Sequence, residues 1–283
     1  MFVLSEGSSP VRCPLKAKSN GEMMREKVGI ILGSPTNYDI LPFRYFILAL
    51  NQVQTIYEFS FPDQEISFVD DEYTEERLLD FVASTHRVVS PTVDYLIAIT
   101  TRRIRGNLFF TSRANVAAIT TDVWEKYFSP PSLFEYLLHC IAATVIFMNP
   151  SLDLDSHVDT RGCVLDYTRW KHDDRIDIAL GYICDNHSEE IQQALGDSYL
   201  KQMQLVIDRK WIGSISDNGT VAYNLKHFFR FDIGRDSGFN KSFWERAKAK
   251  LDELPGEGIK KIIEAIIAVL LAALLLKLGL KKD

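Results

Sequence analysis

A long hydrophobic segment, Ile262–Leu280, lies near the C-terminal end of this chain and limits how the chain can fold. Its uninterrupted apolar part, Ala265–Leu276, is too short to cross a bilayer. With Glu264 and Lys277 included, the segment spans nineteen residues, or roughly 28 Å as a helix. Apolar side chains surround its whole circumference, whereas a helix on a membrane surface has one polar face. The pattern predicts a transmembrane or membrane-inserting helix over residues 259–281. An interfacial helix and a buried helix that packs in an oligomer are the alternatives.

Small residues on one face of this segment favour packing between copies of it. Ala265, Ala268 and Ala272 fall at i, i+3 and i+7, and small side chains let helix backbones approach in a membrane. Glu264 and Lys277 lie near the two ends, where charged groups can reach the headgroups. We expect the helix to self-associate, with membrane lipid and either further copies of the chain or an upstream sensor protein as partners.

The rest of the chain has the composition of a globular protein, with 46% hydrophobic and 25% charged residues. The net charge of −6 argues against nucleic acid as a partner. Residues 1–26 lack the apolar core of a secretory signal and predict a flexible leader. Four scattered cysteines do not suggest a disulfide scaffold. We therefore expect a single-pass, tail-anchored protein with a cytoplasmic N-terminal domain.

Alternating strand and helix patterns indicate an α/β fold, with α+β as the alternative, in which helices flank a mixed sheet. Ser132 and Glu135 form a Ser-x-x-Glu capping box, which predicts a helix that ends near Asn149. The other expected elements are strands at Lys27–Pro35, near Tyr57, at Val93–Thr100 and in the pair 107–112 and 116–121, with helices from Phe43 and at Thr74–His86.

The C-terminal third is expected to have a different architecture. The stretches Met203–Ile215 and 221–233 read as two strands joined at the turn Asn218-Gly219. A charged helix at 239–254 and a linker at Pro255–Gly258 would follow. The predicted organisation is a leader (1–26), an α/β domain (27–200), a hairpin-and-helix extension (201–255) and the terminal helix (259–281).

An acidic region that begins at Ser151 contains a candidate metal site. His157 and Cys163 form one pair, and Cys184 and His187 form a Cys-x2-His pair twenty residues later. Thiolate and imidazole ligands in two close pairs suit a structural zinc ion, which takes four protein ligands and leaves no open position. The alternatives are buried thiols with surface histidines, or mixed sites that use Asp159, Asp166 or His172.

Three arginines, Arg102, Arg103 and Arg105, lie close together in the stretch TTRRIRGN. They could contact phosphate or an acidic partner. The alternative is a solvated loop with no partner.

The order of elements resembles that of a known enzyme family. The strand YLIAIT precedes NLFFTSRANVAAITT, the helix SLFEYLLHCIAATVIFMN follows, and a cysteine-containing region, GCVLDY to GYICDNH, comes next. Over residues 27–195 this order is similar to that of the archaemetzincin branch of the metzincin zinc peptidases. The resemblance implies a metzincin-like fold and a structural zinc ion held by the downstream cysteines.

The catalytic motif of that family, His-Glu-x-x-His-x-x-Gly-x-x-His, is missing. If His139 takes the first position, Cys140 replaces the general-base glutamate and Ala143 and Asn149 replace the other two histidines, with Ile146 at the glycine position. Metal-assisted hydrolysis of this kind requires three ligands and an activating carboxylate. The resemblance therefore implies a degenerate domain, and no catalytic residue is expected.

These patterns favour a membrane-associated, non-catalytic effector or sensor whose cytosolic domain controls the terminal helix. A recognition domain, a Pro-Gly hinge and one hydrophobic helix resemble the layout of bacterial antiviral effectors, which is an analogy of architecture. A membrane-tethered scaffold and a zinc-dependent hydrolase are the alternatives.

Overall fold

The computed structural model describes residues 25–90, 92–124, 129–157, 161–167 and 172–239. All of them fall in one unit, which is separated at Phe239 from residues 240–283. The expected leader, linker, charged helix and hydrophobic helix lie outside the described residues, apart from a few terminal positions. Within the described ranges, no helix has both the length and the apolar character needed to cross a bilayer.

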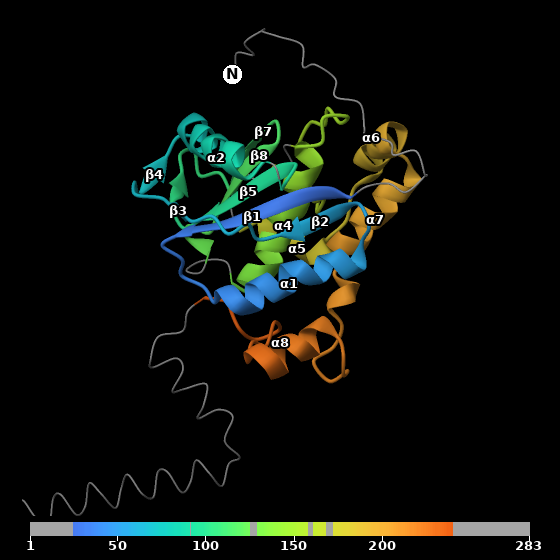
Figure 1. Cartoon of the computed structure of the whole chain (residues 1–283). Coiled ribbons are helices and arrows are strands. Elements are labelled where there is room, and N and C mark those ends of the chain that lie inside the picture. Colours follow the sequence, from blue (N-terminus) through green and yellow to red (C-terminus); the bar gives the residue numbers. More distant parts are fainter. Residues whose placement is uncertain (1–24, 91, 125–128, 158–160, 168–171, 240–283) are drawn as a thin grey trace, which may run out of the picture. The chain divides into compact units, whose positions relative to one another are not determined.

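A six-stranded sheet of order β2-β1-β5-β8-β7 forms the centre of the domain, with β3 also paired to β1 (Figure 1). All pairs are parallel except β7 with β8, which confirms the expected mixed sheet. A separate parallel pair joins β4 and β6. The strands are β1 (Glu26–Ser34), β2 (Tyr57–Ser60), β3 (Ile66–Ser67), β4 (Glu72–Tyr73), β5 (Tyr95–Thr100), β6 (Arg103–Ile104), β7 (Phe110–Arg113) and β8 (Val116–Thr120).

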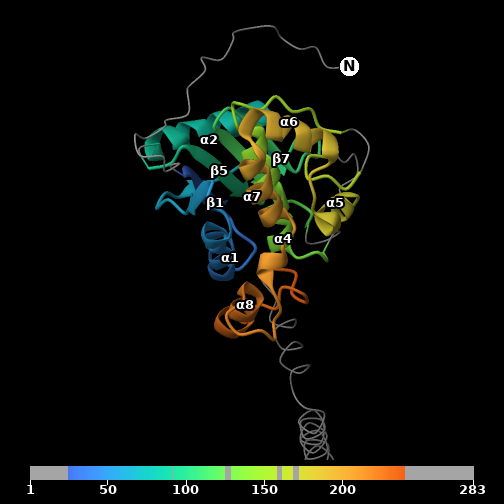
Figure 2. The same cartoon turned by 90° about the vertical axis from the view of Figure 1, so that its right-hand side faces the viewer.

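Both faces of the sheet are buried, so its central strands are apolar at almost every position. In β5, Ile97 and Ile99 belong to the core that includes side chains of α1 and α4, whereas Leu96 and Ala98 belong to the core that includes α2. Figure 2 shows α2 and α1 on opposite sides of the sheet. These helices are α1 (Ile40–Val53), α2 (Glu75–Val89) and α4 (Leu133–Phe147).

Helix α4 begins as its sequence predicts. The Glu135 N–H donates to Ser132 Oγ at 3.3 Å, and the Ser132 N–H donates to Glu135 Oε2 at 3.0 Å, which completes the capping box. Every residue of this helix from Leu133 to Ile146 is buried except the partly exposed Glu135. The helix therefore lies in the interior of the domain, and its polar side chains must find partners there.

The predicted hairpin after residue 200 is wrong. The chain forms α7 (Asp197–Ile207), a 3₁₀ turn at Lys210–Ile212 and α8 (Val221–Phe229). Residues 203, 206 and 207 are buried on one helical face, and the Tyr223 N–H donates to Thr220 Oγ1 at 3.2 Å to cap α8.

The boundary predicted at residue 200 is also wrong, because it falls inside α7. Helix α7 contacts α1, α4 and α6 (Asp185–Leu195), and α8 contacts α1. The part of the predicted extension that the structure describes therefore belongs to the same unit as the sheet.

Candidate metal centre

The four predicted metal ligands converge on one point. His157, Cys163, Cys184 and His187 each place one ligand atom within 4.8 Å of the others. His157 Nε2 lies 3.0 Å from Cys184 Sγ, and His187 Nδ1 lies 3.4 Å from Cys163 Sγ and 3.5 Å from Cys184 Sγ. Ligand atoms around a tetrahedral zinc ion are about 3.3–3.8 Å apart, given the usual Zn–S and Zn–N distances. The spacing fits that ion.

Backbone pairing brings the first two ligands to the second two. The Val164 N–H donates to the Tyr182 carbonyl at 2.9 Å, which places Cys163 beside the segment that enters α6 (Asp185–Leu195). The Tyr167 N–H donates to the His157 carbonyl at 2.7 Å, which closes the loop that carries His157 and Cys163. The chain's own hydrogen bonds therefore assemble the two ligand pairs.

The turn at Cys163 depends on a glycine and a carboxylate. Gly162 has φ +86°, and a Cβ there would collide with Leu180 at the end of α5 (Asp174–Leu180). Asp166 Oδ2 accepts the N–H groups of Arg161, at 2.5 Å, and of Cys163, at 3.1 Å. Asp166 is thus occupied in holding the loop that presents Cys163.

The start of α6 explains the Cys-x2-His spacing. Cys184 is the N-cap residue of this helix but makes no capping bond with its side chain, and His187 lies one turn later. The two side chains therefore reach the same side of the helix end. The Cys184 N–H donates to Cys163 Sγ at 3.4 Å, a contact that also orients the second sulfur.

Hydrogen bonding selects the ligand nitrogen of His187. Its Nε2 lies 2.8 Å from the carbonyl oxygen of Asp155, and only a protonated nitrogen can donate there. The lone pair available to a metal ion is therefore on Nδ1, the atom that faces the two sulfurs. A carbonyl that fixes the tautomer in this way is typical of metal-bound histidine.

The sulfur of Cys163 lies in an environment that disfavours a bare thiolate. Its side chain is fully buried, and burial raises the pKa of the thiol to about 12, against a smaller lowering by the backbone N–H of Cys184. At neutral pH this sulfur would carry a proton unless a cation held it as thiolate. Two cysteines and two histidines around one point have the donor chemistry of a closed zinc site, so the residues fit the metal that the sequence predicts.

The residues considered as alternative metal ligands make other contacts. Asp166 caps the Cys163 loop, and His172 is an exposed residue whose Nε2 lies 2.9 Å from Asp173. Neither belongs to the group of four ligand atoms. Asp159 lies outside the described residues.

The three arginines of the TTRRIRGN stretch lie beside acidic residues of the same chain. Arg102 donates to the Phe68 carbonyl at 3.1 Å and to Asp71 at 2.7 Å, and Arg103 and Arg105 lie 4.0 and 3.8 Å from Glu72. These pairs link the segments of β4 and β6. A role of the arginines in contacting a partner stays a prediction.

A second polar cluster surrounds His139 on α4. His139 Nε2 lies 3.7 Å from Asp174 Oδ1, and both side chains are buried. Burial, together with the nearby charge of Arg209, lowers the pKa of His139 to about 4. The imidazole is therefore neutral at neutral pH, and its contact with Asp174 is not an ion pair.

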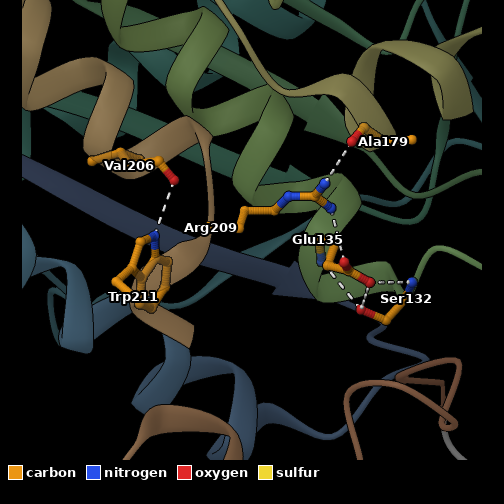
Figure 3. A network of polar contacts seen from close by, with 6 residues as sticks. All are labelled: Ser132, Glu135, Ala179, Val206, Arg209 and Trp211. Carbon is orange, nitrogen blue, oxygen red and sulfur yellow. Dashed lines mark hydrogen bonds and ion pairs between the residues drawn. The ribbon is translucent and has the colours of Figure 1, made fainter. Parts of the chain in front are cut away.

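An ion pair closes this cluster on one side (Figure 3). Arg209 donates to Glu135 Oε1 at 2.9 Å and to the Ala179 carbonyl at 3.1 Å, so it joins the start of α4 to α5. Its backbone has φ +57°, which turns the chain sharply after α7. Trp211 follows and donates to the Val206 carbonyl at 3.0 Å. A cavity of about 10 Å³ lies between Glu135, His139 and Arg209 and has room for at most one water molecule.

Asp177 is the most unusual residue near this cluster. It is completely buried, and burial followed by the charges of Asp174 and Asp166 raises its pKa to about 8, against a smaller lowering by the backbone N–H of Gly162. No pattern in the sequence singles out Asp174, Asp177 or Arg209 as part of a polar cluster. The only available signal was the acid-rich start of α5, which is indistinguishable from an ordinary helix N-terminus.

The fold and the centre define an α/β domain with a Cys2His2 cluster. No family model and no curated protein matches the chain. Among solved structures, archaemetzincin from Methanopyrus kandleri is 16% identical, with a TM-score of 0.41. The match covers 62% of this chain and 97% of that chain. A likeness of this degree identifies neither a family nor a function.

Proposed function

We propose that this chain is a non-catalytic effector or sensor, in which a zinc-stabilised domain controls a membrane-inserting helix near the C-terminal end. The observation that carries the proposal is the convergence of His157, Cys163, Cys184 and His187. Four protein ligands fill a tetrahedral zinc ion and leave no position for a water molecule or a substrate. Such a centre holds structure, and bound zinc would contribute directly to the stability of the domain.

The environment of α4 supports the non-catalytic part of the proposal. At the positions that a metzincin would use for catalysis, Cys140, Ala143, Ile146 and Asn149 are buried. The adjacent cavity holds one water molecule at most, which is too little for a peptide. We propose that the domain is a metzincin-type fold in which this helix has become part of the core.

The membrane part of the proposal rests on the sequence of residues 259–281. A nineteen-residue apolar span after a Pro-Gly linker suits insertion, and its small-residue face suits association. A role in bacterial antiviral defence would agree with this layout by analogy. The proposed event is clustering of the domain, which would bring several helices together in one membrane.

Leakage of a dye from liposomes tests this function. We expect the full chain to release the dye and a chain shortened at Pro255 to leave the liposomes intact. The double variant Ala268→Leu, Ala272→Leu should still bind the liposomes but release less dye, because larger side chains keep the helix backbones apart.

Each outcome of this assay has a distinct meaning. If the double variant leaks as well as the parent, the packing face is wrong. If the parent neither binds nor leaks, the membrane function is wrong and a buried helix takes its place. Binding without leakage would favour a membrane-tethered scaffold. Peptidase activity that is lost in His139→Ala would instead indicate a hydrolase.

A further inference from the structure

Helices α1 and α8 expose large apolar side chains to solvent. On α1, Leu41 and Leu48 lie two turns apart and are 65% and 42% exposed. Phe228, near the end of α8, is 76% exposed. Among the large hydrophobic side chains in the described part of the chain, only that of Val69 is more exposed.

The contact between the two helices brings these side chains to one surface. Asn224 Nδ2 donates to Tyr45 Oη at 2.8 Å, and the rings of Tyr45 and Phe229 lie 5.1 Å apart. Leu41 precedes Tyr45 by one turn of α1, and Phe228 follows Asn224 by one turn of α8. Both exposed side chains therefore border the helix contact. In Figures 1 and 2, α8 lies at the end of the domain remote from α2.

The charges that follow α8 favour an anionic partner. Arg230 and Arg235 are exposed. The acidic residues of the same segment are occupied within the fold, since Asp232 accepts a hydrogen bond from Lys226 Nζ at 3.2 Å and Asp236 accepts the Asp232 N–H at 2.8 Å. Exposed aromatic and basic side chains together are typical of a protein surface that lies on an anionic membrane.

The described part of the chain ends at the same surface. The backbone of Phe239 pairs with that of Tyr38, three residues before Leu41. The chain therefore continues into residues 240–283 from a point beside the start of α1. Residues 240–261, twenty-two in number, connect this point to the hydrophobic segment that begins at Ile262. Insertion of that segment would bring lipid to a high local concentration around the start of the connection.

We propose that the α8 face, made of Leu41, Leu48, Phe228, Arg230 and Arg235, docks on the headgroup layer of an anionic membrane. The inference rests on the membrane function proposed above and adds the surface by which the domain itself contacts lipid. The apolar side chains would enter the boundary between headgroups and acyl chains, and the two arginines would bind lipid phosphates. Docking would restrict the domain to one orientation on the membrane.

Photo-crosslinking of the full chain on vesicles tests this surface. Phe228→p-benzoylphenylalanine places a photoreactive ring on the α8 face. Val69→p-benzoylphenylalanine is the matched control, because Val69 is 81% exposed but lies beside Asp70 and Asp71. The vesicles contain phosphatidylcholine alone or an equal mixture of phosphatidylcholine and phosphatidylglycerol. Flotation measures binding of the chain, and mass spectrometry measures the lipid adduct.

On the anionic vesicles we expect at least about fivefold more lipid adduct from position 228 than from position 69. High salt should reduce the adduct at position 228 by at least about fivefold, because it screens the arginines. The double variant Arg230→Glu, Arg235→Glu should have the same effect without loss of flotation, since the hydrophobic segment is unchanged. The salt series needs no charge reversal, so it holds even if the double variant fails to fold.

Equal adduct at positions 228 and 69 in a chain that floats with the vesicles would overturn the docking surface and leave the proposed membrane function standing. Equal adduct at position 228 on both kinds of vesicle would overturn the anionic partner. Cross-links from position 228 to a second copy of the chain, without lipid adduct, would make this face an interface between copies. A chain that does not float would overturn the membrane function and the docking surface together.

Discussion

Two buried polar regions of this domain, the metal centre and the His139 cluster, contain similar residues but are organised in opposite ways. At the metal centre, His187 has one nitrogen fixed by the Asp155 carbonyl and the other directed at two sulfurs. At the other region, His139 faces one carboxylate at 3.7 Å and lies near the charge of Arg209. Only the first brings lone pairs together at the spacing that a zinc ion requires.

Residue type alone therefore does not identify a metal site in this fold. His139 occupies the position in the sequence that suggests a metzincin ligand, yet it is not part of the group of converging ligand atoms and is integrated into the core beside Asp174. His187 follows a less familiar pattern, yet its hydrogen bonds orient it as a ligand. The arrangement of partners around each ring is the informative feature.

The largest expected effect comes from removing one ligand of the metal centre. Cys184→Ser should lower the free energy of unfolding by on the order of 4 kcal/mol, because binding of a structural zinc ion is coupled to folding. Thermal or urea unfolding, with zinc content measured on the same sample, tests this. The difference between the parent and Cys184→Ser should be greatest near neutral pH and shrink as the pH falls, because protons compete with zinc for the ligands and the parent loses its own zinc stabilisation.

Cys140→Ala is the matched control, since it removes a buried thiol outside the metal centre. It should lose some packing energy but retain one zinc ion per chain. If Cys184→Ser keeps its zinc and melts like the parent, the four residues are ordinary core and surface side chains and the contrast between the two regions disappears.

A smaller effect, with the opposite dependence on pH, is expected at Asp177. Its pKa in the folded state is raised from 3.8 to about 8, so the folded state holds a proton that the unfolded state releases. The contribution of Asp177 to the free energy of unfolding is therefore fully present below about pH 4 and is lost as the pH rises toward 8. Between pH 5.5 and 8, the parent should lose roughly 2–4 kcal/mol relative to Asp177→Asn.

Urea unfolding of the two proteins at several pH values measures this difference directly, because any titration of the metal centre is common to both. Stability curves that run parallel from pH 5.5 to 8 would show that Asp177 is ionised in the folded domain at little cost. The His139 cluster would then be far more polar than its burial indicates.

The smallest of these effects is expected for the ion pair that closes the His139 cluster. Glu135→Gln keeps an acceptor for the Ser132 cap but removes the negative charge that faces Arg209. Both side chains are only about a fifth exposed, so we expect a loss of about 1 kcal/mol. Zinc content should not change. A variant that also loses zinc would show that the two regions are coupled through α5.

Much of the central fold could be predicted from the sequence, because its signals are local. The apolar run of β5, the capping box at Ser132 and the amphipathic pattern of α2 each indicate the observed element. The spacing of Cys184 and His187 likewise follows from one turn of helix at the start of α6.

The predictions are wrong where contacts between residues distant in the sequence determine the structure. The stretch around Val206 and Ile207 has β-branched residues that favour a strand, but packing against α1 and α4 stabilises the helix α7. The partners of Arg209 lie 74 and 30 residues away, so its role could not be read from neighbouring residues.

X-ray absorption at the zinc edge, on the purified full chain and on His139→Ala, tests the central claim most directly. We expect one zinc ion per chain with two sulfur and two nitrogen ligands at about 2.3 and 2.0 Å, identical in both proteins. A chain without zinc, a first shell of only nitrogen and oxygen, or a signal that changes when His139 is removed would contradict it.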